Sequence, residues 1–255
     1  MSAIAISVLV AACVFAGSLA GLLSHGILPA AHRSKETQEV VRLAIGMLSV
    51  LASLVLGLLI ATAKTTYDTA DRDMRAYSAE LLLLDETLRD YGDAALPVRE
   101  ALRHYTAQAL EDSWPRDDGA VVVENQRAGA LLEQVRELVR ALRPGDDGQK
   151  WLVGQALEVS TSLLHQRWRF IEQAGPSVQP VMLAVLASWI VLIFASFGLF
   201  APRNATVLAA FLVCASAIGG SVFLILEMDQ PLQGAFKISS APMRSALQHM
   251  PRPPG

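Results

Sequence analysis

Long apolar runs without charged side chains alternate with polar stretches along this chain of 255 residues. Four charge-free windows stand out: Met1 to Ser24, Leu43 to Ala63, Gln173 to Pro202 with its core near 181–201, and Ala205 to Leu226. Each window reaches or exceeds the ~20 residues that an α-helix needs to cross a hydrocarbon core of about 30 Å. The pattern therefore predicts four transmembrane helices.

The first window is predicted to be a membrane helix rather than a cleaved signal peptide. No basic residue precedes its apolar run, and the run exceeds the ~7 to 15 residues of a signal-peptide hydrophobic region. Four crossings place the amino terminus, the block between the second and third windows, and the tail after Leu226 on one face of the membrane. The Lys and Arg residues near the helix ends do not decide which face this is.

The polar block of residues 64 to 172 has helical periodicity throughout. Tyr67 to Tyr91 continues the second membrane helix without a breaker as far as Gly92. Further helices are expected at about Leu96 to Leu110, with Pro97 in the first turn, at Val123 to Leu142, and at Lys150 to Gln173. The apolar stripes predicted for the last two helices are Leu131, Val135, Leu138 and Leu142, and Leu152, Ala156, Val159 and Leu163. The predicted fold class is all-α, with four transmembrane helices and an inserted helical bundle between the second and third.

The tail after the fourth window contains one more helix signal. Ser240 is placed to cap a short helix that has Pro242 in its first turn, and the apolar face of this helix would hold Met243, Ala246, Leu247 and Met250. We expect this helix to lie on the membrane or on the helical domain, and a frayed terminus is the alternative. The predicted domains are residues 1–63 (transmembrane helices 1 and 2), 64–172 (polar helical domain), 173–228 (transmembrane helices 3 and 4) and 229–255 (polar tail with a short amphipathic helix).

Composition and charge are typical of an integral membrane protein, so the lipid bilayer is an expected partner. Hydrophobic residues make up 53% of the chain and charged residues only 18%. Residues 64–172 hold 14 Lys/Arg and 20 Asp/Glu, a net charge of −6, whereas the remainder has a net charge of +3. Because the only hydrophilic block is acidic, the chain lacks the clustered Lys/Arg that neutralise phosphates, and a nucleic-acid partner is not expected.

The sequence contains little that points to catalysis. The common glycine-rich nucleotide motifs, zinc-hydrolase motifs, nucleophile elbows and C-x-x-C pairs are absent. Glu100 and His104 lie four residues apart on one predicted helix face, but two ligands fall short of the usual three or four, and a surface ion pair or hydrogen bond is the commoner meaning of such a pair. We therefore predict no enzyme activity, no metal site and no cofactor.

The second membrane helix has the most informative pattern. A continuous stripe of small residues, with a cation at each end, follows steps of three or four positions: Arg42, Gly46, Ser49, Ser53, Gly57, Ala61 and Lys64. Small residues allow close helix packing, and Gly17 and Gly21 on the first helix suggest the same use. The alternative is a pore: around a shared axis, the stripes would line a narrow uncharged conduit whose cationic mouths, at Arg42 and Lys64, favour anions. No titratable side chain lies between the two cations, which argues against a proton-coupled carrier.

Several short segments resemble one known family. They are Leu28-Pro29-Ala30-Ala31-His32, Val41-Arg42-Leu43, the run from Ala52 to Lys64, Leu84-Asp85-Glu86-Thr87-Leu88, Tyr91-Gly92, Ser113-Trp114-Pro115 and Asp229 to Gly234. Together they resemble the bacterial bestrophin-like domain family, over almost the whole chain. In the last segment, Gln230 and Leu232 replace the family's expected Arg and Phe, so no anion contact or aromatic plug is expected there. The acidic calcium clasp of true bestrophins is reduced to Glu227 and Asp229, so no calcium gating is inferred.

The resemblance implies a fold, an assembly and a function. Bestrophins are pentameric anion channels with four membrane helices per subunit, cytoplasmic termini and a pore lined by the second helix. It implies a homo-oligomer, a pentamer if it assembles as bestrophins do, in the bacterial inner membrane, with the termini and helical domain in the cytoplasm and passive anion conduction as the function. Because family likeness alone does not establish conduction, the alternative is a non-conducting membrane scaffold or sensor whose helical domain binds a partner protein.

Overall fold

A computed structural model of the chain describes residues 2–24, 35–115, 126–173, 179–232, 234 and 236–250. The elements are α1 (Ala3–Ser24), α2 (Lys35–Tyr91), the short 3-10 helix η2 (Asp93–Ala95), α3 (Leu96–Ser113), α4 (Gln126–Ala141), α5 (Asp147–Gln173), α6 (Pro180–Phe200), α7 (Ala205–Met228) and α8 (Ala241–His249). The described part of the chain is helical without strands, which confirms the all-α prediction. The loop before α2, including the Leu28 to His32 segment, lies outside the described residues.

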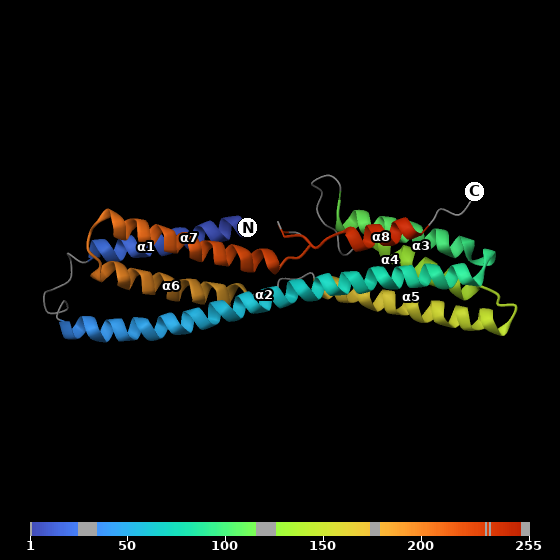
Figure 1. Cartoon of the computed structure of the whole chain (residues 1–255), viewed down its shortest axis with the longest axis horizontal. Coiled ribbons are helices and arrows are strands. Elements are labelled where there is room, and N and C mark those ends of the chain that lie inside the picture. The colour runs from blue at the N-terminus through green and yellow to red at the C-terminus, as the bar shows by residue number, and fades with distance from the viewer. Residues whose placement is uncertain are drawn as a thin grey trace. The chain divides into compact units, whose positions relative to one another are not determined.

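Four helices are long and apolar enough to cross a membrane: α1, α2, α6 and α7 (Figure 1). Their bounds confirm the four windows predicted from charge-free length. Only 17 to 28% of the residues in their apolar stretches are buried within the chain. Most of this apolar surface is therefore available to lipid or to other copies of the protein.

The chain divides into two compact units. The membrane unit comprises residues 1–66 and 176–229, and the helical unit comprises residues 67–175 and 230–255. The 57-residue helix α2 supplies its first half to the membrane unit and its second half to the helical unit. The continuous α2 confirms the prediction that no breaker interrupts this helix before Gly92. Gly92 ends it with a φ of 103°, a left-handed conformation that glycine adopts without strain.

Within the membrane unit, α1 packs against both α6 and α7 (Figure 1). Glycines allow the backbones to approach closely at these crossings. A Cβ placed on Gly21 would overlap the carbonyl oxygen of Ala195 on α6, and one on Gly198 would overlap the carbonyl oxygen of Ser18 on α1. On α7, a Cβ on Gly219 would lie 2.9 Å from the Cβ of Ala11. The packing of α1 against α6 and α7 therefore depends on missing side chains at these crossings.

The tight turn between α6 and α7 also holds the end of α1. The Asn204 side chain accepts a hydrogen bond from the Val207 N–H at 2.8 Å and so caps α7. Arg203 donates to the carbonyl oxygens of Leu22 and Leu23 at 3.2 and 3.4 Å. These carbonyls have no partner inside α1, because the last turn of a helix leaves its carbonyls unsatisfied. Arg203 therefore caps the end of α1, in addition to carrying a positive charge near the membrane surface.

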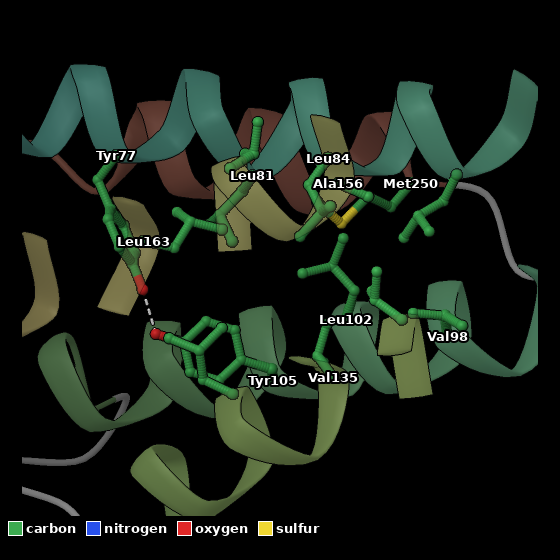
Figure 2. Packing of buried hydrophobic residues seen from close by; sticks show 14 of the residues in the cluster. Tyr77, Leu81, Leu84, Val98, Leu102, Tyr105, Val135, Ala156, Leu163 and Met250 are labelled. Carbon is green, nitrogen blue, oxygen red and sulfur yellow. Dashed lines mark hydrogen bonds between the residues drawn. The ribbon is translucent and has the colours of Figure 1, made fainter. Parts of the chain in front are cut away.

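The helical unit is built around one apolar core from α2, α3, α4, α5 and the tail (Figure 2). Its fully buried side chains include Leu81, Leu84, Leu102, Leu132 and Leu163. On α4 the predicted stripe is partly confirmed: Val135 is fully buried, together with Ala128, Leu132 and Val139, while the predicted Leu131, Leu138 and Leu142 are only partly buried at the flanks of the core. Helical periodicity alone does not distinguish between two neighbouring apolar rows on α4. Packing against α3 and α5 determines which of these rows is buried.

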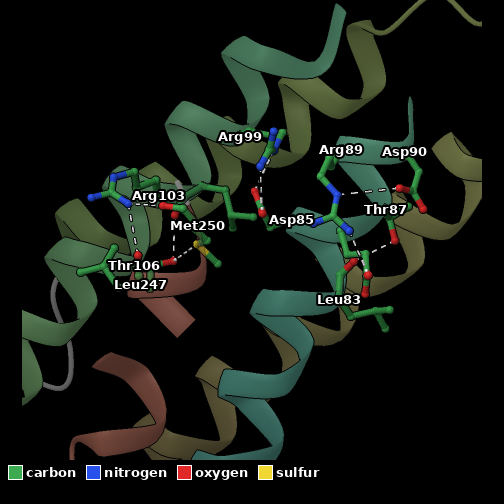
Figure 3. A network of polar contacts seen from close by, with 12 residues as sticks. Leu83, Asp85, Thr87, Arg89, Asp90, Arg99, Arg103, Thr106, Leu247 and Met250 are labelled. Atoms are coloured by element: carbon green, nitrogen blue, oxygen red, sulfur yellow. Dashed lines mark hydrogen bonds and ion pairs between the residues drawn. The ribbon is translucent and has the colours of Figure 1, made fainter. Parts of the chain in front are cut away.

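A buried ion pair links α2 to α3 at the end of the long helix (Figure 3). The Arg99 guanidinium donates two hydrogen bonds to the Asp85 carboxylate, at 2.9 and 3.1 Å. The two side chains are only 14% and 7% exposed, respectively. The hydrogen bonds to Asp85 raise the pKa of Arg99. This bidentate contact holds the start of α3 against α2 in a defined geometry.

The tail packs onto the helical unit through α8, which contacts α3. Met243, Ala246 and Met250 are buried there. Arg103 on α3 donates to the carbonyl oxygens of Leu247 and Met250 (Figure 3), and the Trp114 indole donates to the Ile238 carbonyl oxygen at 3.0 Å. Ser240 is the N-cap residue of α8 as predicted, but its side chain makes no capping hydrogen bond. Instead, the hydroxyl of Ser239 accepts a hydrogen bond from the Ala241 N–H.

Candidate functional site

The membrane half of α2 presents three different faces, which follow from about 3.6 residues per turn. One face packs into the membrane unit through Ile45, Ala52, Leu59 and Ala63. A second face carries large exposed apolar side chains, Leu43, Met47, Val50, Leu54 and Leu58. The stripe predicted from the sequence lies between these two faces. The helix is therefore anchored along one side and leaves the stripe beside an apolar surface.

The stripe is open within a single chain. Arg42, Gly46, Ser53, Gly57, Ala61 and Lys64 are exposed, and Ser49 is half-buried. A Cβ placed on Gly46 or Gly57 would meet no atom of the described residues within 4 Å. The seven positions thus share one surface, and no described residue packs closely against its glycines.

The glycines of α1 behave differently. A Cβ on Gly17 would lie 2.9 Å from the Cγ1 of Val191 on α6, and Gly21 approaches α6 still more closely. Gly17 and Gly21 therefore lie at a crossing inside one chain. The sequence pattern of small residues was the same on both helices, and only the fold separates glycines that face another helix from glycines that face outwards.

One hydroxyl on the stripe lacks a partner among the described residues. Ser and Thr side chains in membrane helices usually donate to the carbonyl four residues earlier, as Ser18 and Thr62 do here at 2.8 and 2.9 Å. The Ser49 hydroxyl is buried but has no hydrogen-bond partner in the part of the chain that the structure describes. Its oxygen is enclosed within the chain, so this hydroxyl does not belong to the exposed part of the stripe.

The chemistry of this surface is simple. From Arg42 to Lys64 it offers hydroxyls, backbone and small side chains, with a positive charge at each end and no titratable group between them. Such a surface can attract anions electrostatically and can accommodate them, but it offers no general base that could activate its hydroxyls. Among the described residues no group of three or more His, Cys, Asp or Glu could hold a metal ion.

The acidic residues at the end of α7 also belong to the membrane unit. Glu227 and Asp229 are only 7% and 5% exposed. The resemblance suggested them as the remnant of a calcium clasp, and the structure places both side chains in the interior, not on an open surface. Two buried carboxylates supply fewer oxygen ligands than the six to eight that calcium takes.

Comparison with known proteins identifies the family. The family model of the Bestrophin-like domain matches residues 11–243. The chain therefore belongs to the Bestrophin-like family of helical membrane proteins. No curated protein matches it.

Solved structures of bacterial bestrophin homologues have the same fold. A homologue from Klebsiella pneumoniae superposes with a TM-score of 0.66 at 12% identity, covering 95% of this chain and 96% of the other. A point variant of the Klebsiella pneumoniae homologue gives a TM-score of 0.70 at 12% identity, covering 98% and 97% of the two chains. A structure described as a membrane protein variant gives 0.64 at 12% identity, with 98% of both chains covered. At this identity the likeness shows the fold alone.

Proposed function

We propose that this protein is a passive anion channel formed by several copies whose α2 helices surround a common axis. Each α2 would turn its stripe towards the axis and its exposed apolar face towards a neighbouring copy or lipid. A pentamer is the assembly that fits the family. The observation that carries the proposal is that the α2 stripe lies open on the chain, whereas the close glycine contacts of α1, α6 and α7 are made inside it.

The charges of the stripe suggest the selectivity. Arg42 and Lys64 would form a ring of cations at each mouth, and such rings favour anions in other pores. Gly46 and Gly57 have no side chains, so the α2 helices of neighbouring copies can approach one another and still leave space between them. The exposed Ser53 hydroxyl can donate to a partly dehydrated anion in that space.

Reversing either cation is expected to lower anion over cation permeability. Because local fields at a charged mouth change ion concentration by roughly tenfold or more, Arg42→Glu or Lys64→Glu should shift the reversal potential measured in a chloride gradient towards the potassium equilibrium potential. Both sites lie at the ends of the apolar window, where charge reversal costs far less than at the bilayer centre. Lys237→Glu, an exposed change in the tail, is the matched control and should leave the reversal potential unchanged.

Filling the middle of the stripe is expected to block the current. Ser53→Trp places a large ring where the proposed conduit holds a hydroxymethyl group, and Ser53→Ala keeps the position small and should conduct like the wild type. If Ser53→Trp instead prevents assembly while the charge reversals have no effect on selectivity, the stripe packs copies together without lining a pathway. The protein would then be better described as a membrane scaffold or sensor whose helical domain binds a partner protein.

We also propose that the protein lies in the bacterial inner membrane with its termini, the 64–172 domain and the 229–255 tail in the cytoplasm. Because the chain has four spans, its termini, domain and tail are expected on the same side of the membrane. Membership of the Bestrophin-like family supports the cytoplasm as that side. Reporter fusions at Gly148 and Gly255 should give a fluorescent cytoplasmic reporter and little periplasmic alkaline phosphatase activity. Strong phosphatase activity from both fusions would reverse the orientation.

A further inference from the structure

Two buried tyrosines meet in the helical unit, away from the α2 stripe. Tyr77 lies on the polar half of α2 and Tyr105 lies on α3, and they are only 4% and 1% exposed. Their hydroxyls share a hydrogen bond (Figure 2). The ring of Phe170 packs edge-on against Tyr77, with the ring centroids 5.7 Å apart. The pair is therefore fixed by packing on one side and by its hydroxyl contact on the other.

The hydrogen bond between the tyrosines leaves one proton unused. Each phenol carries one proton, and a single hydrogen bond between two phenols uses one of the two. Among the described residues the two hydroxyls have no other hydrogen-bond partner. A buried donor without an acceptor costs about 1 to 3 kcal/mol, so the second proton is expected to have an acceptor that is not part of the described chain.

A cavity beside the pair can hold such an acceptor. Its volume is about 50 Å³, and it is lined by both tyrosines and by Arg167, Asp112, Met74 and Met243, among others. A single water molecule needs only about 10 to 15 Å³ of such volume. The cavity therefore has room for a monatomic ion, which is little larger than water, together with water.

The charges around the cavity favour an anion next to the phenols. Burial raises the pKa of both tyrosines, so both are neutral donors at physiological pH, while Arg167 acts in the opposite direction on each. Asp112 lines the cavity too and disfavours an anion, but its carboxylate accepts a hydrogen bond from the Gln108 amide at 2.8 Å. The charge of Glu80 also raises the pKa of Tyr77 and likewise opposes an anion. The balance of these groups suggests weak binding.

We propose that this cavity is a binding site for a small monovalent anion such as chloride, held by a phenolic proton of the Tyr77–Tyr105 pair and by the charge of Arg167. The site lies in the helical unit and binds its ion without passing it on, so it does not depend on the proposed α2 pathway. Its affinity should be in the millimolar range, which would make the stability of the helical unit sensitive to chloride concentration.

The test uses the full-length protein in detergent, where no conduction is involved. Bromide should replace chloride in crystals and give an anomalous peak in the cavity. Chloride should raise the unfolding temperature of the wild type relative to gluconate at equal ionic strength. The Tyr77→Phe/Tyr105→Phe double variant and Arg167→Gln should lose this chloride-dependent shift. A single Phe variant should lose less, because the remaining hydroxyl is freed to donate to the ion.

Two controls keep the result interpretable. Tyr67→Phe/Tyr91→Phe removes the chain's other two tyrosine hydroxyls and should retain the chloride shift. Arg167→Lys keeps the charge and should retain part of it. The readout is the difference between salts within each variant, so a general loss of stability does not mimic a loss of binding. A wild-type cavity that contains only water at saturating bromide, or a cation in place of the halide, would overturn the proposal.

Discussion

Adding a single methyl group at Gly21 is expected to break the membrane unit apart. A Cβ at this position overlaps the Ala195 carbonyl oxygen and would lie 3.0 Å from the Leu199 nitrogen, and both are backbone atoms that cannot rotate away. The helices α1 and α6 would have to separate along their whole crossing. Overpacking typically costs about 1 to 3 kcal/mol, and the overlap here is with backbone atoms, so Gly21→Ala should give little monodisperse protein in mild detergent and a lower unfolding temperature.

Gly220 on α7 supplies the matched control for this substitution. It is exposed, and a Cβ there would meet no atom within 4 Å in the part of the chain that the structure describes. Gly220→Ala should therefore express and elute like the wild type. If Gly21→Ala were as stable as Gly220→Ala, the close approach of α1 and α6 would not exist in the folded protein.

The second large effect is expected from the ion pair between α2 and α3. Asp85→Ala leaves the Arg99 guanidinium largely buried without its partner, and removing one member of a buried pair typically costs about 3 kcal/mol or more. Amide hydrogen exchange on the full-length protein should become faster across the end of α2 and the start of α3. Arg99→Ala should have a similar effect, and the double variant should be less destabilised than the sum of the two.

A surface pair provides the comparison. The Lys150 Nζ lies 2.7 Å from the Asp147 Oδ1, but the side chains of Asp147 and Lys150 are 96% and 64% exposed, respectively. Because water and salt screen such a pair, Asp147→Ala should leave the exchange rates of α2 and α3 unchanged. Equal effects from Asp85→Ala and Asp147→Ala would show that burial adds nothing to the Asp85–Arg99 contact.

The membrane helices were predictable because length and lack of charge act locally. A run such as Ala205 to Leu226 cannot be accommodated in water or in an ordinary core, so its fate follows from the chain itself. The same holds for α2, where no Gly or Pro breaks the polar half before Gly92, and for the α3 start at Pro97. The α4 stripe was only partly right, and the side chain of the N-cap residue Ser240 makes no capping hydrogen bond. Two neighbouring apolar rows, or two neighbouring serines, satisfy a local pattern equally well.

The contacts between helices could not be predicted from the sequence in the same way. Asp85 and Arg99 are 14 residues apart on opposite sides of a turn, and Tyr77 and Tyr105 are 28 residues apart on different helices. Nothing in their local sequence indicates a meeting. The small-residue pattern likewise placed Gly21 and Gly57 in the same class, whereas the fold packs Gly21 against α6 and leaves Gly57 open.

Electrical recording of the purified wild-type protein tests the proposed function most directly. The protein, shown to be folded and oligomeric in detergent, would be reconstituted in planar bilayers with a chloride gradient. We predict single-channel currents that reverse near the chloride equilibrium potential and that Ser53→Trp abolishes. An oligomeric, folded protein that passes no chloride, nitrate or potassium current above protein-free bilayers would contradict the channel and leave the scaffold or sensor as the remaining function.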